Sequence, residues 1–375
     1  MAGVYLHIPF CKQACSYCNF HFSTSLRLKD ALLNALHDEI ARRAGELNGQ
    51  TVRSVYFGGG TPSLLTSAEI NAIWTRLARH LTIEADAEVT LEANPDDLTA
   101  DTLDQLGDTP VNRLSIGIQS FHASDLGFMN RAHNATQARG VLDLIRTSGW
   151  DRVTVDLIYG SPTLSHDAWQ ANLDLIAAYD IPHLSAYQLT VEPRTALAAR
   201  VRQGKQPMMP DEDVIHQFRM LMAWSTDHGY EHYEISNLAR PGHRAIHNSN
   251  YWNRTEYLGL GPSAHSLTGR TRQWNIASNP RYIKMMSDGL AIDASETLSD
   301  TDIFNETVMT RLRLSDGLEL TELAALDASF ATHFVQAIEP FVERGLVVQT
   351  GSHFTLTRDG RCLADHIASE CFVTD

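Results

Sequence analysis

The feature that most constrains the fold of this chain is a repeated alternation between short apolar runs and longer amphipathic stretches. The apolar runs, which predict β-strands, cover residues 4–8, 54–57, 88–92, 113–118, 152–158 and 183–188. The amphipathic stretches, which predict helices, cover residues 26–46, 67–81, 100–106, 136–148, 169–179 and 211–228. This alternation indicates an α/β fold with parallel strands and right-handed crossovers, and both an open doubly wound sheet and a barrel satisfy the pattern.

The pattern changes after residue 238, where Gly, Pro, Asn and aromatic residues predict loops and irregular structure. Helical periodicity returns at residues 302–313, 320–326 and 333–344, and the run 346–357 predicts a hairpin that turns near Gly351. Three helices followed by a hairpin suggest a winged-helix-like α+β module. We therefore expect a strand–helix domain at residues 1–237, a connecting segment at 238–297 and a C-terminal module at 298–375.

The balance of charged residues argues against a nucleic-acid partner. With 45 acidic and 30 basic residues, the chain has a formal net charge of -15 at pH 7, which repels a phosphate backbone. Five cysteines, three of them within one short stretch, do not suggest a disulfide framework. Nothing at the N-terminus resembles a signal peptide, and no apolar run approaches the roughly 20 residues that span a bilayer. We therefore expect a cytoplasmic protein whose contact with a membrane is at most peripheral.

Three closely spaced cysteines, Cys11, Cys15 and Cys18, follow the first predicted strand in a C-x3-C-x2-C pattern. One interpretation is a structural zinc site, in which His21 would be the fourth ligand. The other is a four-iron cluster held by three thiolates, whose remaining iron is free to bind a substrate or cofactor. The place of the motif after a first strand, and the aromatic Tyr17 before the last cysteine, resemble the radical S-adenosylmethionine enzymes and favour the cluster.

That resemblance implies a cofactor for the open iron. In those enzymes the amino and carboxylate groups of S-adenosylmethionine chelate the iron, and an electron from the cluster cleaves the sulfonium to methionine and a 5'-deoxyadenosyl radical. Gly58, Gly59 and Gly60 end the second predicted strand, where missing side chains allow backbone groups to approach a ligand. Such a run by itself is more often a tight turn, and Ser63 stands where a dinucleotide motif would need glycine. Beside the cluster, we expect it to contact the ligand.

Polar side chains also lie at or near the ends of three otherwise apolar strands. These are Glu92, Gln119 and Asp156. The structural interpretation is a core hydrogen bond to Arg113 or Arg152, since a buried carboxylate needs a partner. The functional interpretation is a shared site, because ligands of strand–helix folds bind at the carboxyl ends of the strands. The repeated placement favours the shared site.

Six motifs along the chain are similar to those of the oxygen-independent coproporphyrinogen oxidase group of radical S-adenosylmethionine proteins. In chain order they are YLHIPFCKQACSYC, YFGGGTPS, LEANP, LSIGIQSF, NRAH and DLIYGSP. The resemblance implies a partial (β/α)6 barrel with a C-terminal winged-helix-like domain, and a 4Fe–4S cluster on Cys11, Cys15 and Cys18. It further implies that S-adenosylmethionine is contacted by Tyr5, Tyr17, Gly59, Gly60, Thr61 and Glu92. Gln119, Arg131 and Asp156 match positions that hold a second S-adenosylmethionine in the oxidase, and whether one or two molecules bind here is open.

The chain departs from the oxidases after Cys18, because Phe20 stands where those enzymes have a further cysteine. The first predicted strand also begins at Val4, without the extended segment that precedes it in the oxidases. Both features resemble the haem-chaperone branch of the group, which has an H-N-x-x-Y-W motif, matched here by residues 247–252. The resemblance implies that His247 ligates haem iron while Tyr251 and Trp252 cover the macrocycle.

His247 on a loop would otherwise be a capping or surface residue, and His243 and His265 are weaker candidates for haem ligation. Cys362 and Cys371 are best interpreted as small buried apolar residues.

Two functions compete at this point. In the first, the protein binds haem and transfers it to acceptor proteins, which we expect to be respiratory, with support from the cluster, S-adenosylmethionine and an electron donor. In the second, it is an oxidase that decarboxylates the propionates of coproporphyrinogen III to vinyl groups. The departures from the oxidase motifs favour the haem chaperone without oxidase activity.

Overall fold

Six parallel strands form the centre of the fold. The computed structural model describes residues 1–290 and 294–374, so residues 291–293 of the expected connecting segment and residue 375 of the expected C-terminal module lie outside it. The strands are β1 Ala2–Ile8, β2 Val52–Gly59, β3 Ile83–Ala93, β4 Arg113–Gln119, β5 Val153–Tyr159 and β6 His183–Gln188. Each pairs in parallel with the next along the chain. The strand order has no reversal between β1 and β6, as in a barrel and unlike a doubly wound sheet. The structure thus decides between the two alternatives.

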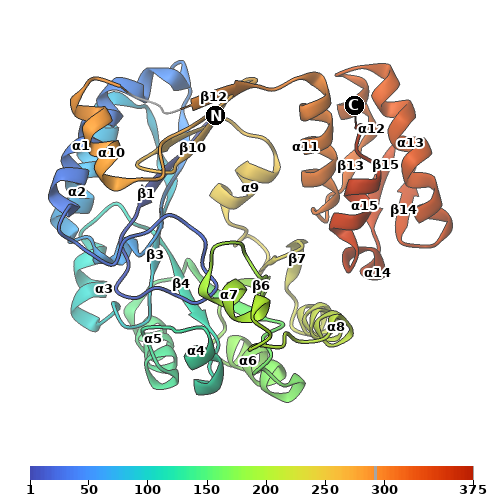
Figure 1. Ribbon diagram of the computed structural model, residues 1–375, viewed down its shortest axis with the longest axis horizontal. Coiled ribbons are helices and arrows are strands. Elements are labelled where there is room, and N and C mark those ends of the chain that lie inside the picture. The colour runs from blue at the N-terminus through green and yellow to red at the C-terminus, as the bar shows by residue number, and fades with distance from the viewer. Residues whose placement is uncertain (291–293, 375) are drawn as a thin grey trace.

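Helices cover the outer face of these strands (Figure 1). Six lie where the periodicity predicted them: α1 Lys29–Arg43, α2 Ser67–His80, α3 Ala100–Gly107, α5 Ala135–Ser148, α6 His166–Ala178 and α8 Asp211–Asp227. The short helices α4 Ala123–Phe128 and α7 Ala196–Arg202 were not predicted, because fewer than two turns give no clear period. No helix in the described part of the chain combines the length and apolar character needed to cross a bilayer.

The prediction of irregular structure after residue 238 is wrong. Following β7 Glu231–Glu234, the chain forms β8 Asn237–Ala239, α9 Ile246–Trp252, β9 Tyr257–Leu260, β10 His265–Thr268, β11 Thr271–Trp274, α10 Asn279–Ser287 and β12 Ala294–Thr297. Strand β9 lies parallel to β1, and β10, β11 and β12 extend the same sheet in antiparallel pairs. Each element is short, and the Gly and Pro residues between them masked its period.

A buried ionic network fastens α1 to this added part of the sheet. The Glu39 carboxylate is 0% exposed and accepts hydrogen bonds from Arg43 Nη1 (2.8 Å), Tyr282 Oη (2.6 Å), Gly261 N (2.7 Å) and Asn275 Nδ2 (2.6 Å). Buried charges are tolerated when they are paired and their remaining hydrogen-bonding capacity is satisfied. The network therefore anchors residues 261–282 against the N-terminal helix.

The C-terminal part has its own hydrophobic core, which includes Phe304, Phe334 and Phe354. It contains α11 Asp300–Leu312, β13 Leu318–Glu319, α12 Leu320–Ala324, α13 Ala328–Glu343, β14 Val347–Thr350, β15 His353–Leu356, α14 Arg358–Arg361 and α15 Ala364–Glu370. The three helices and the hairpin predicted here are present, and the three strands form a separate sheet. The domain boundary after residue 297 remains our proposal, since the large sheet ends with β12 and the second core begins at Phe304.

We expect the substitution Arg43→Met to lower the free energy of unfolding by about 3–5 kcal/mol, because it leaves the buried Glu39 carboxylate without its countercharge. The matched control is Lys284→Met, which removes the cation of an exposed ion pair with the same i,i+4 spacing (Lys284–Asp288, 2.8 Å) and should cost under about 1 kcal/mol. Equilibrium unfolding in urea, followed by circular dichroism, measures both. Equal effects of the two substitutions would contradict the role given to the network.

Candidate cofactor site

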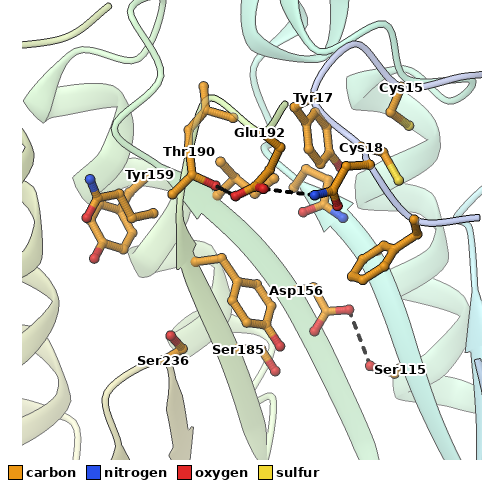
Figure 2. A pocket seen from close by; sticks show the side chains of 18 of the residues that line it. Cys15, Tyr17, Cys18, Ser115, Asp156, Tyr159, Ser185, Thr190, Glu192 and Ser236 are labelled. Carbon is orange, nitrogen blue, oxygen red and sulfur yellow. Dashed lines mark hydrogen bonds between the residues drawn. The ribbon is translucent and has the colours of Figure 1, made fainter. Parts of the chain in front are cut away.

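A single cavity of about 810 Å³ brings together most of the residues predicted to bind cofactors (Figure 2). It opens at the carboxyl ends of the barrel strands, where strand–helix barrels place their sites. Its wall includes the following predicted residues: Cys11, Cys15, Tyr17, Cys18, Gly59, Gly60, Thr61, Glu92, Gln119, Arg131 and Asp156. The predicted residues Tyr5 and His247 do not line it.

The three cysteines lie on the loop between β1 and α1 as free, partly exposed thiols. Burial raises the pKa of Cys11 to about 11 and also raises the pKa of Cys18. Arg131 Nη1 donates to Cys15 Sγ at 3.2 Å, the kind of hydrogen bond to sulfur that tunes an iron–sulfur cluster. Backbone bonds from Ser16 N to Met129 O (2.9 Å) and from Leu197 N to Ser16 O (2.8 Å) hold the loop over the strand ends.

The zinc interpretation is disfavoured by the surroundings of His21. Its Nε2 is paired with Asn279 Oδ1 at 2.7 Å, and the residue does not line the cavity. Among the described residues, no three His, Cys, Asp or Glu side chains gather tightly enough for one metal ion.

The glycine turn allows the end of strand β2 to pack directly against the cysteine loop. A Cβ at position 60 would lie 2.6 Å from Phe10 O, and a Cβ at position 59 would lie 2.6 Å from the His7 ring. Gly59 also has φ 108°, a conformation that favours glycine. Both glycines still face the cavity. The motif therefore forms a tight turn, and its geometry also leaves the backbone open to a ligand in the cavity.

The Glu92 carboxylate accepts hydrogen bonds from other groups inside the barrel and is not paired with an arginine. Its Oε1 accepts from Tyr56 Oη at 2.8 Å and its Oε2 from Gly59 N at 3.0 Å. Arg113 instead lies 3.6 Å from the Glu88 carboxylate. Burial, with the nearby Asp156 adding to it, raises the pKa of Glu92 to about 7. A cationic amino group in the cavity would favour the ionised carboxylate, so Glu92 fits an ammonium ligand.

Arg131 joins the cysteine loop to the ends of β3 and β4. Besides Cys15, it donates from Nη2 to Asn94 Oδ1 (2.6 Å) and to Gly117 O (2.7 Å). Its Nε is buried and has no hydrogen-bond partner in the described structure. A buried polar group without a partner is costly, and the other two nitrogens of the guanidinium hold the cysteine loop to the strand ends.

Asp156 and Gln119 complete this side of the cavity. Ser115 donates to Asp156 Oδ2 at 3.3 Å, and burial raises the pKa of Asp156 to about 6. Gln119, the last residue of β4, has φ 66°, so the chain turns sharply where the side chain faces the cavity. A non-glycine residue in this conformation is uncommon and is a feature of many binding sites.

His247 lies inside the barrel on α9 and is 2% exposed. Its Nδ1 is paired with Ser54 Oγ (2.9 Å), its Nε2 with Tyr251 Oη (3.1 Å), and its ring stacks on Tyr56 with centroids 4.9 Å apart. Burial lowers the pKa of His247 to about 3. Ligation of haem iron would require the ring to leave these partners, and it stays a prediction. Tyr5 is also internal, with its hydroxyl 3.1 Å from His7 Nδ1.

Several residues that line the cavity were not predicted. They are Tyr56, Asn94, Ser115, Gly117, Ser185, Tyr187, Asn248, Arg313 and Arg361, among others. A signal existed for Ser115 in β4 and for Ser185 and Tyr187 in β6, because each lies an even number of positions from another polar residue of its strand and therefore shares its face. No local pattern pointed to Arg313 or Arg361, which reach the cavity from the C-terminal part.

We expect the stability of the cofactor-free Glu92→Gln variant, relative to wild type, to depend on pH. The folded-state pKa of Glu92 is raised to about 7 from a usual 4.5, so folded protein binds more protons than unfolded protein between these values. Wild type therefore loses stability as pH rises through this window, whereas glutamine does not titrate. The free energies of unfolding are measured in urea at about pH 5 and about pH 7.5. At the higher pH, the stability of the variant should rise relative to that of wild type. A pH-independent difference would contradict the raised pKa.

Comparison with protein-family models gives two matches. The Radical SAM superfamily model matches residues 5–176, and the HemN C-terminal domain model matches residues 298–363. Among solved structures, coproporphyrinogen III oxidase (HemN) from Escherichia coli matches with a TM-score of 0.85 at 25% identity, covering 99% of this chain and 90% of that one. The expected fold, a parallel-stranded α/β barrel with a HemN-type C-terminal domain, is thereby confirmed.

Two relatives that match this chain over nearly their full length carry the same name. Heme chaperone HemW of Mycobacterium tuberculosis is 35% identical over 371 residues, covering 97% of this chain and 93% of that protein. Heme chaperone HemW of Bacillus subtilis is 30% identical over 373 residues, covering 98% of each chain. The mitochondrial radical S-adenosyl methionine domain-containing protein 1 of Mus musculus is 40% identical over 284 residues, covering 73% of this chain and 64% of that protein. On this evidence, the chain belongs to the HemW family of the radical S-adenosylmethionine superfamily.

Proposed function

We propose that this protein is a haem chaperone that holds a 4Fe–4S cluster, S-adenosylmethionine and haem in its cavity and transfers the haem to acceptor proteins. The observation that carries the proposal is that Cys11, Cys15, Cys18, Glu92 and Arg131 all open into one cavity. Relatives named as haem chaperones support the haem part of the proposal. Respiratory acceptors, an electron donor and peripheral membrane contact belong to the same proposal and rest on the resemblance alone.

The cluster side of the cavity has groups that suit the amino and carboxylate groups of S-adenosylmethionine. The three thiolates would hold the cluster, which when bound supplies an open iron and an electron for cleaving the sulfonium. Glu92 accepts from the amino group, while Gly59 and Gly60 allow the backbone to approach it. Gln119, Arg131 and Asp156 contact the remainder of one or two bound molecules.

The opposite side of the cavity suits a flat apolar ligand. Its wall contains Tyr159 from β5 and Val214, Ile215 and Phe218 from α8. The Tyr159 and Phe218 rings stack, with centroids 6.0 Å apart and planes 13° apart. Aromatic and aliphatic walls of this kind bury macrocycles through dispersion and the hydrophobic effect. We therefore assign the haem to this side.

Oxidation of coproporphyrinogen III is the second candidate function, favoured by the structural likeness to the Escherichia coli oxidase. Phe20, at the position of the oxidases' additional cysteine, argues against it, and so do the names of the full-length relatives. A shared fold does not decide between the two, because function depends on the residues of the site.

Each of the substitutions Cys11→Ser, Cys15→Ser and Cys18→Ser should abolish cluster assembly, because a weaker hydroxyl ligand replaces one of three thiolates. Iron and sulfide are measured per chain after anaerobic reconstitution, together with the change that S-adenosylmethionine causes in the electron paramagnetic resonance spectrum. Cys362→Ser is the matched control, since Cys362 lines the same cavity and should leave the cluster intact. Zinc in the purified protein, or loss of iron in the control, would contradict a cluster with an open iron.

Wild-type protein, reconstituted without oxygen, should bind haem in a titration followed by absorbance and should leave coproporphyrinogen III unchanged. Production of the divinyl product would instead establish the oxidase. The variant His247→Ala tests haem ligation in the same titration. Ligation predicts a shifted haem spectrum and weaker binding. An internal role predicts an unchanged spectrum and a free energy of unfolding lower by about 1–3 kcal/mol, because Ser54 and Tyr251 lose a buried partner.

A further inference from the structure

The C-terminal part contributes a positively charged corner to the cavity. Arg361, the last residue of α14, lines the cavity and donates to the carbonyl oxygen of His232, whose ring packs edge-on against Phe218 of α8 with centroids 5.8 Å apart. In Figure 2 the pocket is seen with Tyr159, the barrel residue of this side, lying across from Cys15 and Cys18. The corner therefore belongs to the side of the cavity assigned to haem and not to the cluster side.

The charge of Arg361 has no counterion in the described structure. Its guanidinium makes one hydrogen bond there, from Nη1 to the carbonyl oxygen of His232 at 3.3 Å, and no ion pair. Arg358 on the same helix is a second cation, whose Nη2 donates to Met222 O at 2.6 Å. Burial and the repulsion from Arg358 both lower the pKa of Arg361.

Arg313 lies on the same wall and, unlike Arg361, has carboxylate partners. It pairs with Glu234 at 2.9 Å and with Asp365 at 2.7 Å. Asp365 also lines the cavity, but it is already the partner of Arg313, and His366 is largely exposed. Burial and the nearby Arg361 lower the pKa of His232 to about 4, so this neighbour supplies no negative charge. In a chain with 45 acidic and 30 basic residues, a half-buried arginine without a carboxylate is unexpected. A half-buried cation of this kind is stabilised when a ligand supplies the anion.

The side chains of the wall limit the chemical class of ligand that fits this corner. Val214, Ile215, Phe218 and Leu363 give the corner an apolar surface, so a small hydrated anion such as phosphate is a poor match. A carboxylate attached to a large apolar body fits both features, since the body covers the wall and the carboxylate meets the guanidinium fork. Two proposed ligands have carboxylates: haem on its propionates, and S-adenosylmethionine on its methionine end.

We infer that Arg361 binds a propionate carboxylate of haem, and that this ion pair fixes the orientation of the macrocycle between α8 and α14. The inference rests on the proposed function, in which haem occupies this side of the cavity. The methionine carboxylate is the less suitable source, because it is needed at the cluster, and the cysteines lie across the pocket from Tyr159. Arg361 reaches the site from the C-terminal part, so that part contributes directly to ligand recognition.

The test combines a change in the protein with a change in the ligand. Haem and haem dimethyl ester, in which both propionates are esterified, are titrated into full-length wild type, Arg361→Ala, Arg361→Lys and Arg219→Ala. Arg219→Ala is the matched control. This substitution removes the same charge, but from an exposed ion pair with Asp359 on the neighbouring surface. Circular dichroism and thermal unfolding verify that each variant is folded, and S-adenosylmethionine affinity is measured in parallel.

We expect Arg361→Ala to weaken haem binding by about tenfold to a hundredfold, the usual effect of losing a charge-assisted hydrogen bond. Arg361→Lys should recover part of that loss, Arg219→Ala should bind like wild type, and the ester should bind wild type and Arg361→Ala equally weakly. The inference is overturned if Arg361→Ala binds haem like wild type, if it loses haem and ester affinity equally, or if S-adenosylmethionine affinity falls instead. Failure of wild type to bind haem at all would overturn the proposed function itself.

Discussion

The close approach of two loops is the constraint on which the site depends. Gly60 N donates to Ile8 O at 2.9 Å, and Thr61 N donates to Phe10 O at 2.6 Å, so the glycine turn and the cysteine loop share backbone hydrogen bonds. A side chain at position 60 would displace the Phe10 carbonyl. Because Gly59 in the same turn also binds the Glu92 carboxylate, the thiols and the acidic group are held in one rigid frame.

The barrel interior around this frame is polar, and several of its side chains are hydrogen-bonded to one another. Tyr56 is central, since it donates to Glu92 and stacks on His247 of α9. The Glu88 carboxylate accepts from the backbone N–H of His247 at 2.8 Å, so helix α9 is bound at its N-terminal end. At its other end the guanidinium of Arg313 lies over the ring of Trp252, 5.3 Å from its centroid. The H-N-x-x-Y-W motif thereby connects the acidic group of the cavity to the C-terminal part.

The C-terminal part changes what the barrel can hold. Strand ends alone form an open edge, whereas α14 and the start of α15 close it into a cavity of about 810 Å³ with an apolar, cationic corner. One fold can serve different functions through the residues of its site, so these facing residues, and not the barrel alone, matter for the ligand that we propose on this side.

The sequence by itself determined the six parallel strands, most of the helices and the cysteine motif, because each is encoded in the period or spacing of a continuous stretch. Tertiary structure decided the rest. The segment after residue 238 forms strands because β9 pairs with β1, a contact between distant residues that no local pattern shows. Likewise Tyr5 and His247 turn into the barrel, while Arg361 reaches the cavity, since packing between remote elements sets which side of an element faces a ligand.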